Sequence, residues 1–430
     1  MAPNPAIAQA IQKLGYRVTV GDVAAQAGLD LNVAQQGLLV LASDAGGHLQ
    51  VAQTGEIVYQ FPQNFQAILR NKFWRLRLLA AWQKIWKVLF YLLRISFGIM
   101  LLVSIFLIFV SIAIILMAVN SSRDGDGDRG DFGGGGIIFF PSFDWFWFFY
   151  PDYNTPQYQY RRREKPEMNF LEAIFSFLFG DGNPNANLEE RRWQEIATVI
   201  RHNGGVAVAE QISPYLDNIG EGFAREYEDY MLPVLTRFNG LPEVSPAGQI
   251  VYRFPDLQVT ATQQHLKPVV PYLEELPWRF SAASSGQIML AIGLGALNLI
   301  GASVLGNLLA GGTVAAQLGG LVAFVQSIFW LLLGYGTGFL VIPLIRYFWI
   351  QWRNRKIDQS NQQRQVRARQ LNQANPQLQQ KIAYARQFAA ETVIKREDLV
   401  YTTETDLVEQ EAENKERIDA EWQRRLKGEG

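Results

Sequence analysis

The side chains that most often carry out chemistry are few and widely spaced in this chain. It contains no cysteine, which excludes disulfides, thiolate zinc sites, a cysteine nucleophile and thiolate ligation of an iron–sulfur cluster. Its three histidines, His48, His202 and His265, are too scattered to indicate a metal site. No nucleophile with a paired base, phosphate-binding loop or metal cluster is recognisable. We therefore expect no catalytic residue, no metal and no cofactor, although a diffuse site of Asp and Tyr stays open.

One acidic string imitates the start of a calcium-binding loop. Asp124, Asp126 and Asp128 alternate within a glycine-rich segment. An EF-hand loop requires glycine at its sixth position and glutamate at its twelfth, where this chain has Arg129 and Gly135. The departure favours a solvated, flexible loop over a calcium site.

Two long uncharged stretches predict membrane-spanning helices. Residues 95–119 contain no charge and, at about 1.5 Å per helical residue, exceed the roughly 30 Å of bilayer hydrocarbon. No charge occurs between Arg279 and Arg346 either, which predicts two helices, at 287–310 and 318–345, joined by a tight turn.

Glycines in this hairpin should let the two helix backbones approach closely. They are Gly293, Gly295, Gly301, Gly306, Gly334, Gly336 and Gly338. No ionisable residue lies within the hairpin spans, although transporters usually need one. A channel or transporter built on the glycine-rich hairpin is therefore kept as an alternative only.

Basic and aromatic residues beside the spans predict the orientation. Residues 70–87 hold six Lys or Arg, no acid, and Trp74, Trp82 and Trp86, the pattern of an interfacial helix on an anionic leaflet. Basic residues also follow the last span, at 346–356. Because basic flanks stay on the cytoplasmic side, we expect both termini to be cytoplasmic.

Two cytoplasmic ends require an even number of crossings, whereas the strong spans number three. The missing return is assigned to the aromatic tract at 137–150, which holds Trp145 and Trp147 and is followed by Arg161, Arg162 and Arg163. As a helix the tract would cover only about 21 Å. We interpret it as a re-entrant or interface-embedded segment, with a strained fourth crossing or an aromatic belt on the far face as alternatives.

Outside the membrane, an eight-residue string occurs twice. GEIVYQFP at 55–62 and GQIVYRFP at 248–255 share six of eight positions at an offset of 193 residues. In each copy, three apolar-periodic helices are followed by two short strands around a turn, and the repeated string contains the last strand. This is the order of a winged helix. The helices are expected at 6–14, 20–27 and 32–43, and at 193–201, 208–215 and 222–238.

Alternate residues of the last strand in each copy should pack into the module core rather than form a site. They are Ile57, Tyr59, Phe61, Ile250, Tyr252 and Phe254. Charge argues against DNA, because the third helix of the first copy has no basic residue and the second copy has six arginines against eleven acids. Acidic winged helices suit protein partners better, and a membrane-tethered transcription regulator stays an alternative.

A signature near the aromatic tract carries a family resemblance. FFPSFDWFWFFYPDY, YRRR and, at 168–185, MNFLEAIFSFLFGDGNPN resemble an uncharacterised integral membrane protein family of cyanobacteria and chloroplasts, over about residues 5–350. The resemblance implies a cyanobacterial plasma or thylakoid membrane, or a chloroplast membrane. Plant members carry an iron–sulfur cluster biosynthesis label, but a chain without cysteine cannot supply thiolate ligands. From its residues alone, NFLEAIFSFLF is a short amphipathic helix suited to lie on the bilayer.

The tail beyond the last span is polar, with Pro376 breaking a long helix, and is expected to be a solvated helix or a partner-binding arm. Together these features predict a mainly α-helical membrane protein with three transmembrane helices, an aromatic re-entrant or interfacial segment and two small α+β winged-helix-like modules. We expect a non-enzymatic scaffold or assembly factor that contacts anionic lipid headgroups and presents the modules and tail to protein partners. Oligomerisation through the glycine-rich helices stays open.

The expected segments follow one another along the chain. They are winged-helix-like module 1 at 1–65, a basic interfacial helix at 66–94, a span at 95–119, the Gly/Asp loop and aromatic segment at 120–165, the amphipathic helix and turn at 166–188, module 2 at 189–265, a linker at 266–286, spans at 287–310 and 318–345, and a charged helical tail at 346–430.

Overall fold

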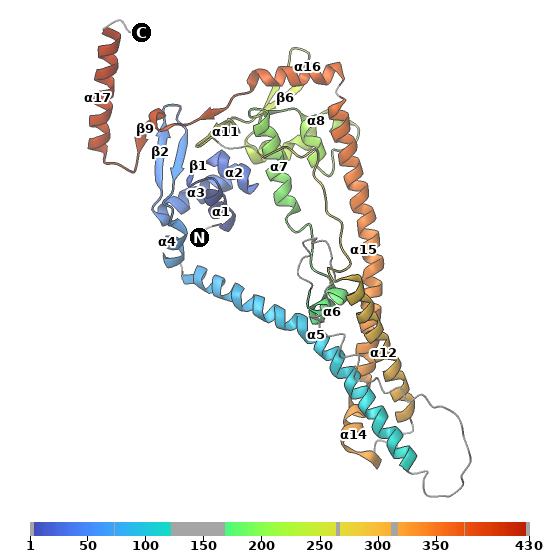
Figure 1. The fold of residues 1–430 in the computed structure, drawn as a ribbon. Helices are drawn as coiled ribbons and strands as arrows, with labels where there is room; N and C mark the ends of the chain where they lie inside the picture. The colour runs from blue at the N-terminus through green and yellow to red at the C-terminus, as the bar shows by residue number, and fades with distance from the viewer. Residues whose placement is uncertain are drawn as a thin grey trace, which may run out of the picture. The chain divides into compact units, whose positions relative to one another are not determined.

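Figure 1 shows a mainly helical chain with a few small sheets. The computed structural model describes residues 4–72, 74–121, 168–263, 267–310, 317–373 and 375–426. The chain forms two compact units, each assembled from separate stretches of sequence. Unit 1 comprises Met1–Trp82, Pro184–Leu276 and Lys356–Gly430, and unit 2 comprises Gln83–Asn183 and Pro277–Arg355.

The first stretch of unit 1 folds into helices and a small antiparallel sheet. Its elements are α1 (Pro5–Lys13), β1 (Arg17–Thr19), α2 (Val20–Ala27), α3 (Leu31–Ala45), β2 (His48–Ala52), β3 (Ile57–Gln60) and α4 (Phe65–Lys72). Thr19 and Asp22 form a reciprocal capping box that starts α2, and Gly28 ends α2 in the left-handed conformation, with φ 64°. The helices expected here are present. Strand β1, which pairs with β3, was not expected because three residues are too few for alternation to show.

The second stretch has the same order of elements. They are α7 (Leu188–His202), β4 (Val206–Ala207), α8 (Ala209–Ile212), η2 (Ser213–Tyr215), α9 (Phe223–Glu226), η3 (Asp229–Met231), α10 (Leu232–Phe238), β5 (Leu241–Val244), β6 (Ile250–Arg253), α11 (Pro255–Gln258) and β7 (Val259–Thr260). The strand order β4-β6-β5 parallels β1-β3-β2. The single helix expected at 222–238 is wrong. Glu228 adopts a positive φ of 57° and Pro233 lies in the first turn of α10, so the chain forms three short pieces.

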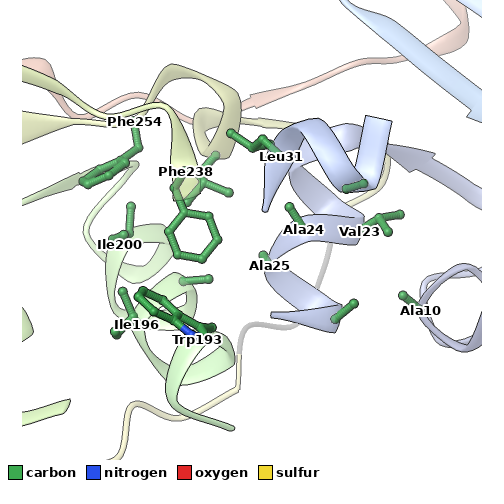
Figure 2. Packing of buried hydrophobic residues seen from close by; sticks show 14 of the residues in the cluster. Ala10, Val23, Ala24, Ala25, Leu31, Trp193, Ile196, Ile200, Phe238 and Phe254 are labelled. Carbon is green, nitrogen blue, oxygen red and sulfur yellow. The ribbon is translucent and has the colours of Figure 1, made fainter. Parts of the chain in front are cut away.

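The two modules share one hydrophobic core, shown in Figure 2. Trp193 and Phe238 of the second module face α2 of the first. Arg237 closes this junction, because its guanidinium lies 4.3 Å from the ring centroid of Trp193 and donates to the carbonyl oxygen of Gly28 at 2.9 Å. A Cβ at Gly28 would lie 2.8 Å from the carbonyl oxygen of Glu190, so this position also permits the close approach of the modules.

The C-terminal stretch of unit 1 packs against both modules. Its elements are α16 (Pro376–Ala385), η4 (Arg386–Phe388), β8 (Thr392–Val393), η5 (Arg396–Asp398), β9 (Leu399–Thr402) and α17 (Leu407–Leu426). Strand β9 extends the first sheet to β1-β3-β2-β9, and β8 pairs in parallel with β7. The expected solvated helical tail is therefore wrong for residues 376–402. A sparse apolar set, Leu378, Ile382 and Ala385, packs on Val206, Val208 and Val251 of the second module.

Unit 2 contains the helices that can cross a membrane. The described residues include three helices long and apolar enough, within α5 (Trp74–Ser121), α12 (Ser285–Leu309) and α15 (Phe329–Asn372), which agrees with the expected number of spans. The interfacial helix expected at 66–94 is not a separate element, because α5 begins at Trp74 and continues without a break into the span. The span expected at 318–345 is also divided: α14 (Gly320–Ser327) ends at Ile328 and α15 begins at Phe329.

Helix α6 (Phe170–Phe179) lies inside unit 2 rather than on a bilayer surface. Ile174, Phe177 and Leu178 are buried against side chains of α5, α12 and α15. The expectation of a bilayer-facing helix is wrong because the segment is apolar on nearly all sides, which is the pattern of a buried helix.

Four of the seven hairpin glycines face a neighbouring helix, including Gly336, where a Cβ would lie 3.4 Å from the Leu299 backbone. A Cβ would lie 2.5 Å from the Phe339 ring at Gly295, 2.6 Å from the Phe329 ring at Gly306 and 3.0 Å from Ile108 at Gly301. At Gly293 and Gly334 a Cβ would meet no atom within 4 Å. The predicted role therefore applies to the glycines that face a neighbouring helix.

Candidate functional site

A cleft of about 300 Å³ opens in unit 1 between the two modules. It lies at the lower end of the volumes typical of small-molecule sites, roughly 300–1,000 Å³. The starts of α2 and α3 and the turn into β3 border it from the first module, and the end of α10 and the start of α11 border it from the second. The lining residues are Thr19, Val20, Gly21, Leu31, Asn32, Gln35, Gly55, Glu56, Ile57, Tyr59, Thr236, Asn239 and Asp256. None of them is cationic.

Two carboxylates border the cleft, one from each module. Asp256 accepts a hydrogen bond from the side-chain amide of Asn239 at 3.1 Å. The Glu56 carboxylate makes no hydrogen bond or ion pair within the described part of the chain. Burial raises the pKa of Glu56, and the negative charge of Asp256 raises it further. The lining therefore carries negative charge that no lining cation balances.

Tyr59 is a buried residue of the cleft lining whose hydroxyl has no partner among the described residues. The residue is 1% exposed, and it projects from the same face of β3 as Ile57, which also lines the cleft. Its hydroxyl forms no hydrogen bond among the described residues, and burial raises the pKa of the phenol. A buried phenol usually has a hydrogen-bond partner. The cleft is where a bound molecule could supply one.

The repeat-related tyrosine of the second module has such a partner. Tyr252, which is 3% exposed, donates its hydroxyl to Glu228 at 2.8 Å. Burial, followed by the charge of Glu228, raises the pKa of Tyr252 far above its usual value. Glu228 also pairs with Lys381 of α16 at 2.5 Å. The two related tyrosines therefore share a backbone position but differ in the environment of the hydroxyl.

A buried aspartate next to the cleft links the two modules. Asp22 is fully buried and accepts hydrogen bonds from Arg201 at 2.8 Å, from the Thr260 hydroxyl at 2.9 Å and from the Ala261 amide at 3.0 Å. The partners come from α7 and from β7 and the residue after it, so one carboxylate of the first module ties down two parts of the second. The neighbouring Gly21 would place a Cβ 1.9 Å from the Asp256 carbonyl oxygen, so no side chain fits there.

The C-terminal stretch adds further buried charges to unit 1. Lys381 pairs with Glu210 at 2.9 Å as well as with Glu228, and Arg364 pairs with Glu275 at 2.7 Å and with Asp217. Lys381 and Arg364 are almost fully buried. These groups are already paired within the protein and act as structural links rather than as free functional groups.

The residues predicted for the bilayer interface are only partly described. Trp82 and Trp86 on α5 are exposed, at 58% and 53%. The side chain of Trp74 lies outside the described residues, as do Trp145, Trp147, Arg161, Arg162, Arg163 and the acidic string from Asp124 to Asp128. Within the described residues, no group of three or more His, Asp or Glu is placed to hold a metal ion.

The residues assigned to the repeat core differ in how deeply they are buried. Tyr59, Phe61, Tyr252 and Phe254 are buried, whereas Ile57 is 36% exposed in the cleft and Ile250 is partly buried at the core edge. The sequence analysis treated all six as packing residues, and it therefore did not predict that Tyr59 lines the cleft.

Sequence reasoning also missed Glu56 and Asp256, although a signal was present. At the offset of 193 residues, Glu56 corresponds to Gln249 and Asp256 corresponds to Gln63. Both cleft carboxylates therefore stand where the other copy has a neutral amide. Departures from the repeat, rather than its identities, mark this site.

Three membrane-capable helices joined to a sheet-containing unit define an integral membrane protein. The chain is 37% identical over 434 residues to an uncharacterised chloroplast protein of Arabidopsis thaliana, At5g03900, and the match covers 97% of this chain and 81% of that protein. The chain belongs to the family of this chloroplast protein. The name of the Arabidopsis protein does not mention iron–sulfur clusters. No protein-family model and no solved structure matches the chain.

Proposed function

We propose that the chain is a non-enzymatic membrane scaffold or assembly factor that presents two fused winged-helix-like modules to protein partners at a photosynthetic membrane or plastid envelope. The three spans anchor it, and unit 1 offers the surface that partners meet. The membrane assignment of this chain to a plastid or its cyanobacterial counterpart rests on the chloroplast location in the relative's name.

The exposed face of α3 is the observation that carries this proposal. In a winged helix this third helix would enter a DNA groove and would need Lys or Arg. Here the exposed residues are uncharged and partly apolar, with Val33 at 47%, Leu39 at 45% and Val40 at 39% exposure beside Gln36. Apolar groups spaced along one helix face fit a protein surface, because phosphates offer them nothing. A membrane-tethered transcription regulator is correspondingly disfavoured.

The topology of the proposal follows from the shared core. Both modules and the C-terminal stretch belong to unit 1, which supports placing them on one side of the membrane. If α12 and α15 each cross the membrane once, the chain ends on the side from which α12 began, whereas a single crossing by α5 changes the side. We therefore propose an even number of crossings and assign unit 1 and both termini to the cytoplasmic side. The aromatic tract at 137–150, to which the return was assigned from sequence, lies outside the described residues.

Lipid contact is the second part of the proposal. Trp82 and Trp86 are exposed beside Lys84 and Lys87 on the N-terminal part of α5. Aromatic side chains anchor at the headgroup level, and the ammonium groups attract anionic lipids. This part of α5 then serves as an interfacial segment, although it is continuous with the span.

Site-specific photocrosslinking tests the scaffold proposal. A photoreactive amino acid replaces Gln36 on α3, and in a matched control it replaces Gln380, which is exposed on α16. In native membranes the Gln36 probe should form a discrete adduct with a protein, and Leu39→Lys should reduce that adduct several-fold. The proposal is contradicted if Gln36 yields no protein adduct, or if both positions yield the same species.

A channel is the remaining alternative, and one buried polar contact in the spans bears on it. The Ser104 hydroxyl of α5 donates to the Asn298 amide oxygen of α12 at 2.9 Å, and both residues are buried. Such a bond between helices in an apolar bundle is an ordinary packing device. Reconstituted vesicles should therefore show no ion or solute flux above protein-free vesicles.

A further inference from the structure

The cleft between the modules combines three features that point to a ligand. It has a volume of about 300 Å³, it is bordered by carboxylates from both modules, and it is lined by the buried Tyr59, whose hydroxyl has no partner among the described residues. The related Tyr252 shows how this fold satisfies the same hydroxyl, with Glu228 as acceptor. At Tyr59 the protein leaves that position open toward the cleft.

Charge narrows the class of ligand. Glu56 and Asp256 carry negative charge, and the other polar lining groups, such as Asn32 and Gln35, are neutral. An anion would be repelled, and an uncharged ligand would leave the two carboxylates unbalanced. A cation with several N–H donors can bridge the carboxylates and also donate to the phenol oxygen of Tyr59.

A metal ion is a poorer fit than an organic cation. Calcium takes six to eight oxygen ligands and magnesium near-ideal octahedral geometry, whereas two carboxylates from separate modules supply few. No third His, Asp or Glu joins them within the described residues. The cleft volume also exceeds what a single metal ion requires.

We infer that the cleft between the modules binds a guanidinium or primary ammonium group, held between Glu56 and Asp256 and donating a hydrogen bond to the Tyr59 hydroxyl. The planar guanidinium fits best, because its five N–H donors can contact both carboxylates and the phenol at once. The cation can belong to a free small molecule or to an arginine side chain of a protein partner. Binding of the first kind does not depend on the scaffold proposal.

Calorimetric titration of the full-length protein in detergent tests the inference. The probe is N-acetyl-arginine amide, and the control is N-acetyl-citrulline amide, a neutral compound of nearly the same shape. The arginine compound should bind and the citrulline compound should not. Glu56→Gln and Asp256→Asn should each weaken binding about tenfold, the effect of losing one charge-assisted hydrogen bond.

Tyr59→Phe separates a site from a purely electrostatic attraction. It removes one oxygen and no charge, so it should weaken the arginine probe by roughly threefold while the thermal midpoint stays unchanged. Gln249→Glu is the matched control, because Gln249 occupies the position in the second module that corresponds to Glu56. This variant should not increase binding of the arginine probe. Equal affinity for arginine and citrulline compounds, or binding unchanged by both Glu56→Gln and Asp256→Asn in folded protein, overturns the inference.

The photocrosslinking probe at Gln36 then distinguishes the source of the cation. If the cation is an arginine of a partner, Glu56→Gln should also reduce the protein adduct formed from Gln36. If the adduct is unchanged while the arginine probe still binds the unmodified protein, the site takes a free small molecule. Loss of the scaffold proposal would leave the calorimetric result standing.

Discussion

Two tyrosines at the same repeat position give the most direct comparison at the scale of single residues. Tyr252 donates to the carboxylate of Glu228, which Lys381 also contacts, whereas Tyr59 has no hydrogen-bond partner in the described part of the chain. The Tyr59 side chain is 1% exposed and lines the cleft, so a molecule bound there can contact its hydroxyl.

The tyrosine pair makes a prediction for stability. Tyr252→Phe should lower the free energy of unfolding by about 1.5–3 kcal/mol, because a hydrogen bond to a charged group is lost. Tyr59→Phe should leave it unchanged or slightly raised. Denaturant unfolding of both variants in detergent measures the difference. A loss at Tyr59→Phe as large as that at Tyr252→Phe would mean that the Tyr59 hydroxyl has a structural partner.

The raised pKa of Glu56 predicts that the stability of the folded protein depends on pH. The folded-state pKa of Glu56 is raised by burial and by Asp256 on α11, so the unfolded chain ionises first as the pH rises above the ordinary value of 4.5. The contribution of Glu56 to stability is therefore largest at low pH and falls as the pH rises through the raised pKa. Glu56→Gln removes this loss.

The midpoint of thermal unfolding, followed from pH 4 to pH 7, checks the effect. The difference between Glu56→Gln and the unmodified protein should be near zero at pH 4 and should favour the variant at pH 7. Asp256→Asn should reduce that difference, because it removes the neighbouring negative charge. A difference that is constant with pH, or that favours the unmodified protein at pH 7, would contradict the assignment.

At the scale of helices, the membrane hairpin depends on where its glycines face. Gly295 lies against the ring of Phe339 on α15, which is almost fully buried, whereas Gly293 on the same helix faces open space. Gly295→Ala should destabilise the protein by about 1–3 kcal/mol, the usual cost of overpacking. Gly293→Ala is the matched control and should cost nothing. Thermal unfolding in detergent compares the two, and equal effects would contradict the packing of α12 on α15.

The strong periodic elements could be predicted from sequence. The two long uncharged stretches and the helices expected at 6–14, 20–27 and 32–43 follow from length and apolar spacing. The short strands β1, β4, β8 and β9 could not be predicted, because two to four residues carry no usable alternation and their pairing depends on distant partners.

The C-terminal stretch illustrates why the rest was missed. Leu378, Ile382, Tyr384 and Ala385 are the residues of α16 that pack on the second module, and such a narrow stripe resembles a solvated helix. Its docking depends on Lys381, whose partners Glu210 and Glu228 are more than a hundred residues away in sequence. Residues of the cleft were missed for a related reason, since Glu56 and Asp256 meet only when the modules pack together.

At the scale of the whole molecule, unit 1 is assembled from three stretches that the spans separate in sequence. Asp22 of the first stretch pairs with Arg201 of the second, and β2 of the first pairs with β9 of the third. These contacts can form only if all three stretches lie in the same compartment. The fold of unit 1 therefore constrains the membrane topology of the chain.

Single-cysteine labelling tests this central claim most directly, and the chain has no cysteine of its own to interfere. Cysteines are placed one at a time at Ser43, Asn218 and Gln380, which are exposed positions in the three stretches of unit 1. In sealed vesicles of known orientation, an impermeant maleimide should label all three from the same face, the cytoplasmic one. Labelling of Ser43 and Asn218 from opposite faces would contradict the shared core, the even number of crossings and the cleft built on both modules.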